Sequence, residues 1–278
     1  MIDSFDFKEP ACKLCGGKEF YNPDQNAPSG RIPIARILEK TDESFNKKDY
    51  EEAKRLLEYW KNEAVSLKDK QGELTLQSEL VGFYRKMLDK DNAYKAIDRA
   101  FELINALGVE NSVSTATILL NIATAYKAFG EAEKAIPLFL QVETSYKQHF
   151  DNGNQQFGGL YNNMALAYVD LEQFEQAQIA YENAIKVMSK VPNGQTDLAI
   201  TYVNLSYLYE KMEKDKKDVV DCLFKAFNLL NDENLPHDGY YAFVCEKCAP
   251  AFSDFGFDAV YQDLMRQARE IYERNRNI

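Results

Sequence analysis

The tyrosines of this chain recur at a nearly constant interval. Four of them lie 42, 42 and 41 residues apart: Tyr84, Tyr126, Tyr168 and Tyr209. Three alanines, each nine residues after its tyrosine, keep the same interval: Ala93, Ala135 and Ala177. A period of this length is typical of proteins whose repeated unit is a pair of helices. The spacing therefore predicts an all-α solenoid, and such a stack offers a long concave surface and usually no catalytic pocket.

Turn-forming residues divide the chain into about six predicted helix-turn-helix pairs. Pro, Gly, Asn and Asp cluster between the helical stretches, close to the interval that the tyrosines set. We expect a right-handed superhelix, with Asp49 as the N-cap of the second helix. The predicted pairs are Arg31–Leu67, Glu73–Ala106, Ser114–Lys147, Gly158–Ser189, Thr196–Leu230 and His237–Asn275.

The first 30 residues differ from the rest of the chain. They are rich in Pro, Gly, Asn and Asp, and they contain the sequence CKLCGG from Cys12 onward. Residues 1–30 are therefore predicted to form an irregular tail with a CxxC motif, and residues 31–278 to form the repeat array.

Charge and motif content argue against several classes of function. The 278-residue chain has a net charge of −11, whereas binding to nucleic acid or to an anionic membrane needs a broad basic face. The N-terminus does not resemble a signal peptide, and no apolar run approaches membrane-spanning length. There is no phosphate loop, dinucleotide fingerprint or HExxH motif. We expect a cytoplasmic, non-catalytic protein without a nucleic-acid or membrane partner.

Small residues and tyrosines at these offsets resemble the tetratricopeptide repeat. The segments LLNIATAY at 119–126 and AIPLF at 135–139 are similar to the 42-residue repeats of kinesin light chains. The resemblance extends from Arg31 to the C-terminus, and the end units depart from it: the first has Ser44 and the sixth Ala251 where tyrosine is expected. It implies helix-turn-helix pairs that bind a peptide or a protein.

Three asparagines occupy the same register position in successive pairs. These are Asn121, Asn163 and Asn204, and Asn162 adds a fourth amide. Asparagine is a mediocre helix former, so helix propensity does not explain the column. An amide donates and accepts hydrogen bonds at once, which suits the backbone of an extended peptide. The resemblance implies the same role, since asparagines at this position hold peptide backbones in the family. The alternative is that these amides satisfy neighbouring helix ends or water.

The same register places charged and apolar side chains on the predicted concave face. Arg85, Lys86 and Lys127 form a basic cluster that would hold a ligand carboxylate, unless they are ordinary solvated charges. Leu166 and Tyr207 would then offer apolar surface to the side chains of the ligand.

Four of the five cysteines form two CxxC pairs, Cys12/Cys15 and Cys245/Cys248. Together they are candidates for a tetrahedral zinc site. Two observations oppose it. Cys248 falls in the small-residue packing position of the sixth pair, and the two CxxC pairs lie at opposite ends of the predicted array. Packing thiols and a redox dithiol are the alternatives, and a zinc site shared between two chains would imply a homodimer.

The sequence favours one function and leaves a second open. The favoured function is an adaptor or receptor that holds an extended protein or peptide segment in its concave groove. The second is a self-associating scaffold whose CxxC tail docks on its own or a neighbouring array, with zinc as the bridge. An enzyme that uses the cysteines is disfavoured because no base accompanies them.

Overall fold

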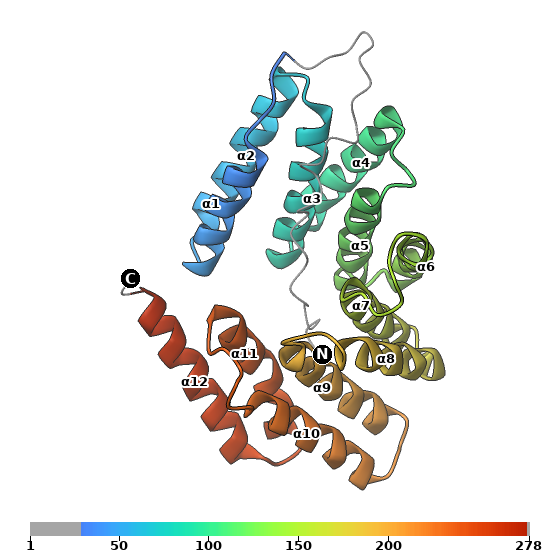
Figure 1. The fold of residues 1–278 in the computed structure, drawn as a ribbon, viewed down its shortest axis with the longest axis vertical. Helices are drawn as coiled ribbons and strands as arrows, with labels where there is room; N and C mark the ends of the chain where they lie inside the picture. The colour runs from blue at the N-terminus through green and yellow to red at the C-terminus, as the bar shows by residue number, and fades with distance from the viewer. Residues whose placement is uncertain (1–28, 277–278) are drawn as a thin grey trace. The chain divides into compact units, whose positions relative to one another are not determined.

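The computed structural model describes residues 29–276, and this part of the chain contains twelve α-helices and no strand. Consecutive helices pack against each other as six pairs, so the all-α fold of six helix-turn-helix pairs is confirmed (Figure 1). The helices are α1 (Ile34–Asn46), α2 (Tyr50–Ser66), α3 (Lys70–Lys86), α4 (Lys90–Leu107), α5 (Val113–Ala128), α6 (Ala132–His149), α7 (Gln156–Asp170), α8 (Phe174–Met188), α9 (Gln195–Lys211), α10 (Lys216–Leu230), α11 (Gly239–Asp254) and α12 (Asp258–Arg276).

The described residues fall into two compact units. Residues 29–149 contain α1 to α6, and residues 150–276 contain α7 to α12. Several first helices of successive pairs contact one another within a unit: α3 packs on α5, α7 on α9, and α9 on α11. This contact between first helices brings side chains about one repeat apart in sequence next to each other.

One backbone hydrogen bond closes the turn of every pair. Five residues after the tyrosine position, an N–H donates to the carbonyl oxygen at that position, at 2.6 to 3.0 Å. The residue before the donor adopts a left-handed conformation, as in the Schellman motif that ends many helices. The carbonyl oxygens belong to Ser44, Tyr84, Tyr126, Tyr168, Tyr209 and Phe252.

This turn corrects the register of the sixth pair. Phe252, not Ala251, occupies the tyrosine position there, because the loop between α9 and α10 is one residue longer than the equivalent loops and shifts the alignment. The small-residue position therefore falls on Ala249. Cys248 instead takes the position that holds larger apolar residues in other pairs: Leu80, Ile122, Met164 and Leu205. All of these residues are buried, and the thiol is fully enclosed.

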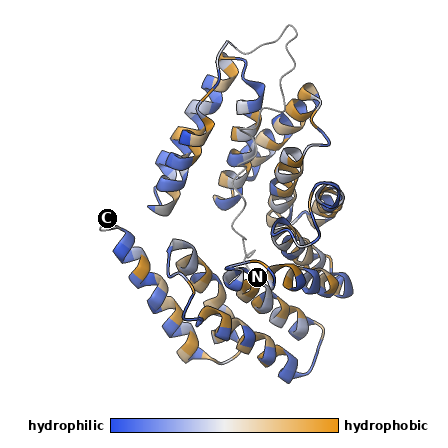
Figure 2. Ribbon diagram, in the orientation of Figure 1, coloured by the Kyte–Doolittle hydropathy of each residue, from blue (hydrophilic) through white to orange (hydrophobic). Residues whose placement is uncertain are grey.

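Buried alanines and aspartate caps explain why the helices pair where they do. Ala93, Ala135 and Ala177 are fully buried on the second helices, where the absence of a larger side chain lets two backbones approach. The predicted cap is confirmed, because the carboxylate of Asp49 accepts a hydrogen bond from the N–H of Glu52 at 3.1 Å. Hydrophobic and hydrophilic residues alternate along α2 and α12, as expected for helices with one buried face (Figure 2).

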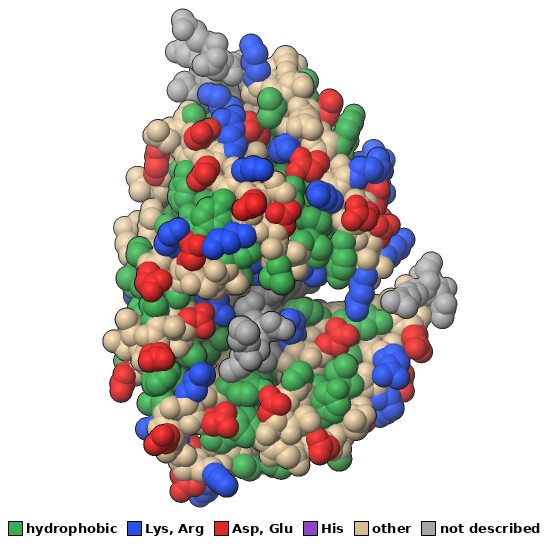
Figure 3. Space-filling view, turned by 180° about the vertical axis from the view of Figure 1, so that it is seen from behind, with side chains coloured by type: hydrophobic (Ala, Val, Ile, Leu, Met, Phe, Trp, Pro, Cys, Tyr) green, Lys and Arg blue, Asp and Glu red, His purple; other side chains and the backbone are tan. Residues whose placement is uncertain are grey.

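Charges of both signs are interspersed on the face drawn in Figure 3. No broad patch of lysine and arginine gathers on that face. Within residues 29–276, no helix combines the length and hydrophobicity that crossing a bilayer requires.

Candidate functional site

Two of the predicted asparagines form hydrogen bonds between successive first helices. In residues 29–149, the Asn121 side chain on α5 donates to the Ser78 hydroxyl on α3 at 3.0 Å. In residues 150–276, the Asn204 side chain on α9 donates to the side-chain carbonyl oxygen of Asn162 on α7 at 3.3 Å. Ser78 and Asn162 both lie six residues before the tyrosine of their pair. The two units therefore repeat one contact in the same register.

Three polar atoms of these amides take no part in the two hydrogen bonds. The side-chain carbonyl oxygens of Asn121 and Asn204 are buried and have no hydrogen-bond partner among the described residues, and the same holds for the side-chain nitrogen of Asn162. Leaving a buried amide atom unpaired costs about 1–3 kcal/mol. Such atoms are expected to be retained where something else satisfies them.

Asn163 lies one residue beyond Asn162 and is buried, with 6% of its surface exposed. Its side chain forms no hydrogen bond with another residue of the described part. Asn204 bonds to Asn162 and not to Asn163, although Asn163 is its equivalent in register. The amides therefore do not bond to one another at a single register position. Each bond joins two neighbouring register positions on adjacent first helices.

The three predicted basic residues lie in different surroundings. Arg85 and Lys127 are buried, with 8% of the surface of each exposed. Lys86 is exposed, and its ammonium group lies 4.9 Å from the ring centroid of Phe45 and 5.1 Å from that of Tyr50. This cation–π contact holds the charge of Lys86 toward α1 and the start of α2.

The two predicted apolar contacts also take part in packing. Leu166 is buried in a core cluster that includes Val203. The Tyr207 hydroxyl on α9 donates to the Asp254 carboxylate on α11 at 2.5 Å, and its ring packs against Phe255. Burial and this hydrogen bond raise the pKa of Tyr207. Tyr207 thus connects the fifth pair to the sixth.

Of the four predicted zinc ligands, the structure describes two. Cys245 and Cys248 on α11 are fully buried free thiols, and burial raises the pKa of both, that of Cys245 to about 12. A protonated thiol is a poor metal ligand and a poor nucleophile. No group of three or more metal-ligating side chains occurs within residues 29–276. Cys12 and Cys15 lie outside the described residues, so the zinc site stays a prediction.

Comparison with known proteins identifies the repeat. Residues 72–148 and residues 159–187 each match a tetratricopeptide-repeat family. The chain contains tetratricopeptide repeats. No sequence among the curated proteins matches it.

Two solved structures share the fold of this chain. A kinesin light chain of Podospora anserina with nearly identical TPR-like repeats is 18% identical, with a TM-score of 0.52 over 72% of this chain and 94% of that one. BtubC (BKLC) from P. vanneervenii is 17% identical, with a TM-score of 0.50 over 89% of this chain and 94% of that one. At these identities the likeness shows the fold alone, which agrees with the kinesin-light-chain-type resemblance.

The presence of this repeat favours protein binding over catalysis. Tetratricopeptide repeats commonly mediate protein interactions and are generally non-catalytic. The partners of the asparagines were not predicted from the sequence, although a signal was present: Ser78 and Asn162 precede their tyrosines by the same six residues. The cavity beside Arg31 and Arg36 was not predicted either, because nothing in the period marks it.

Proposed function

We propose that this tetratricopeptide-repeat protein is a non-catalytic adaptor or receptor that binds an extended peptide segment. In this proposal Asn121, Asn163 and Asn204, together with Asn162, hold the backbone of the peptide along the first helices. Arg85, Lys86 and Lys127 favour a ligand with negative charge, and Leu166 and Tyr207 contribute apolar surface.

The observation that carries the proposal is the repeated pattern of unused amide atoms. Asn121 and Asn204 each use the side-chain nitrogen to bond the preceding first helix and keep a buried carbonyl oxygen without a partner. The inter-helix bond fixes the orientation of the amide before any ligand arrives. A fixed acceptor loses little conformational entropy on binding, which favours affinity.

The chemistry of these atoms matches a peptide backbone. An extended peptide presents N–H donors and carbonyl acceptors along its length. The free carbonyl oxygens of Asn121 and Asn204 accept from N–H groups, and the free nitrogen of Asn162 donates to a carbonyl. Recognition of this kind is independent of the ligand's side chains, so sequence preference must come from the neighbouring charged and apolar residues.

The experiment compares wild type with Asn121→Ala/Asn204→Ala on an array of random peptides, followed by calorimetric titration of the strongest binder. Each net hydrogen bond contributes about 0.5–1.5 kcal/mol. We therefore expect the double variant to bind about 10- to 100-fold more weakly. Asn105→Ala/Asn228→Ala, which removes two exposed asparagines from the second helices, should bind like wild type.

A further control separates binding from stability. Ser78→Ala removes the partner of the Asn121 nitrogen and leaves the carbonyl oxygen in place, so it should lower the free energy of unfolding more than it weakens binding. Wild-type affinity in Asn121→Ala/Asn204→Ala, with the fold intact by circular dichroism, would mean that the amides only connect helices.

A further inference from the structure

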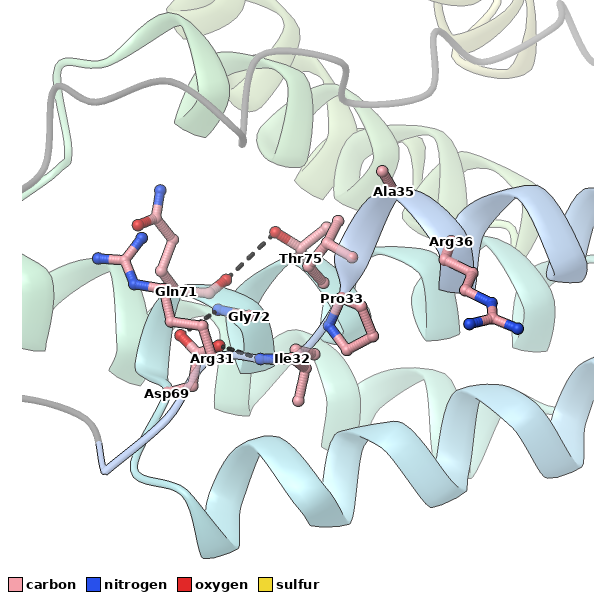
Figure 4. Close-up of a pocket in the computed structure, with 10 residues that line it drawn as sticks. Arg31, Ile32, Pro33, Ala35, Arg36, Asp69, Gln71, Gly72 and Thr75 are labelled. Carbon is pink, nitrogen blue, oxygen red and sulfur yellow. Dashed lines mark hydrogen bonds between the residues drawn. The ribbon is translucent and has the colours of Figure 1, made fainter.

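Residues 29–149 contain a second candidate site, away from the asparagines. A cavity of about 410 Å³ lies where the chain enters α1 and passes the start of α3. Figure 4 shows Arg31 and Gln71 at one end and Arg36, on α1, at the other, with Pro33 and Thr75 between them. Ligand pockets commonly span roughly 300–1,000 Å³, so the cavity has room for one or two residues of a peptide.

The wall of the cavity is a segment, residues 29–33, that is fixed to the α2–α3 loop. The Ser29 N–H donates to the Leu67 carbonyl at 2.9 Å, and the Ile32 N–H donates to the Asp69 carboxylate at 3.1 Å. Gly72 makes this approach possible, because a Cβ there would lie 2.5 Å from the Asp69 carboxylate and 2.7 Å from Ile32. The segment is therefore held in place by contacts that a larger residue at position 72 would disrupt.

The charges around the cavity are unbalanced. The guanidinium groups of Arg31 and Arg36 form no ion pair or hydrogen bond with another residue of the described part, in a protein whose net charge is −11. Asp69 is the acidic residue that lines the cavity, and both of its oxygens already accept backbone hydrogen bonds, from Ile32 and Gly72. The charged lining groups without a partner in the described part are therefore the two arginines, one at each end of the cavity.

The walls are chemically mixed in a way that suits a peptide. Pro33 and Ala35 provide apolar surface between the two arginines. Gln71 supplies an amide at one end. Thr75 is buried, and its hydroxyl already donates to the Gln71 carbonyl at 3.2 Å, so it contributes shape more than hydrogen bonding. A ligand with carboxylates on both sides of an apolar side chain would place each charge near an arginine.

We propose that this cavity binds the carboxylate groups of a peptide that carries an apolar side chain between them. Arginine binds carboxylates through paired N–H donors, and this pairing strengthens where apolar walls exclude water. The inference rests on the proposed peptide-binding function and adds a second site, which selects acidic, apolar segments. The carboxylates come from acidic side chains or from a peptide C-terminus.

The test uses the full chain and three fluorescein-labelled peptides, measured by fluorescence polarisation. The first is Gly-Glu-Leu-Glu-Leu with a free carboxylate, the second is its C-terminal amide, and the third is Gly-Gln-Leu-Gln-Leu amide. We expect the third, which has no carboxylate, to bind at least about tenfold more weakly than the first. If the second binds like the first, side-chain carboxylates are recognised, and if it binds like the third, the terminus is recognised.

Matched variants assign the effect to the cavity. Arg31→Gln/Arg36→Gln should lose the preference for the acidic peptide. Arg55→Gln/Arg266→Gln changes the net charge equally, at arginines paired with carboxylates elsewhere on the surface, and should keep it. Equal weakening by both double variants, or equal affinity for the acidic and neutral peptides, overturns the proposal.

The asparagine variant distinguishes this site from the proposed clamp. Asn121→Ala/Asn204→Ala should weaken all three peptides by a similar factor and leave their ranking unchanged. If that variant binds like wild type while the arginine variant loses the preference, the cavity stands and the clamp fails. If the asparagine variant binds all three peptides more weakly while the arginine variant keeps the preference, the clamp stands and the cavity proposal fails.

Discussion

At the scale of single residues, the buried cysteines of α11 are packing groups in an apolar core. Cys248 takes the position of Leu80 and Ile122 in earlier pairs. We expect Cys248→Ser to lower the free energy of unfolding by about 1–3 kcal/mol, because the hydroxyl would be buried without a partner. Cys248→Ala adds no polar group and should lower it less. Urea unfolding followed by circular dichroism measures both.

The same measurement tests the zinc prediction. If Cys245 and Cys248 hold zinc with Cys12 and Cys15, a chelator should destabilise the wild type and leave Cys248→Ser unaffected. With packing thiols, the chelator changes neither unfolding midpoint. We expect the second result, because burial raises the pKa of both thiols and favours the protonated form.

At the scale of helix pairs, the turn after each first helix strains some residues and not others. Leu88 adopts φ 56° and is 76% exposed, whereas the third and sixth pairs have Gly130 and Gly256 at this position. A left-handed conformation costs a non-glycine residue about 1 kcal/mol. We therefore expect Leu88→Gly to raise the free energy of unfolding by about 0.5–1 kcal/mol, measured by urea unfolding.

Two controls for Leu88→Gly separate the effect of backbone strain from that of side-chain exposure. Leu88→Ala removes the exposed side chain but keeps the Cβ, so it should give little of the gain. Gly130→Ala should lower the free energy of unfolding by a similar amount through backbone strain alone. A clash does not contribute, because no atom outside the local backbone lies within 4 Å of the added Cβ. A gain from Leu88→Ala equal to that from Leu88→Gly would assign the effect to exposure of the leucine.

The period predicted the pairs well because helix packing repeats it. The six predicted segments begin and end within three residues of the observed helices. The first begins at Arg31 and α1 at Ile34, because the intervening residues belong to the segment fixed to Asp69. The register failed where loop length changed, at Phe252. It also gave no direction for the side chain of Lys86, because the aromatic rings that attract it come from another pair. Periodicity identifies equivalent positions but not the neighbours that each one contacts.

At the scale of the whole molecule, both units use phenol–carboxylate pairs to connect their helices. In residues 29–149, Tyr84 donates to Glu58 and Tyr94 to Glu131. In residues 150–276, the hydroxyls of Tyr207, Tyr240 and Tyr272 donate to Asp254, Asp197 and Glu246. Each pair needs the phenol to keep its proton, since a phenolate beside a carboxylate would repel it.

These pairs predict alkaline unfolding. Burial, and then the bond to Glu131, raises the pKa of Tyr94 from 10.0 to about 12. Burial, and then the bond to Glu58, raises the pKa of Tyr84. The folded state therefore binds more protons than the unfolded state once the pH exceeds 10. The stabilisation is complete below pH 10 and is lost as the pH rises through about 12. We expect the urea midpoint to fall steadily over this range.

Tyr94→Phe tests the contribution of one pair. It removes the hydroxyl, so it should lower stability at neutral pH and make the decline above pH 10 less steep. Tyr59→Phe changes an exposed tyrosine, 55% exposed, whose hydroxyl donates to no carboxylate in the described residues, and it should leave the decline unchanged. If Tyr94→Phe loses stability with pH as steeply as wild type, the alkaline transition comes from other groups, such as the buried thiols, and the phenol–carboxylate pairs contribute packing alone.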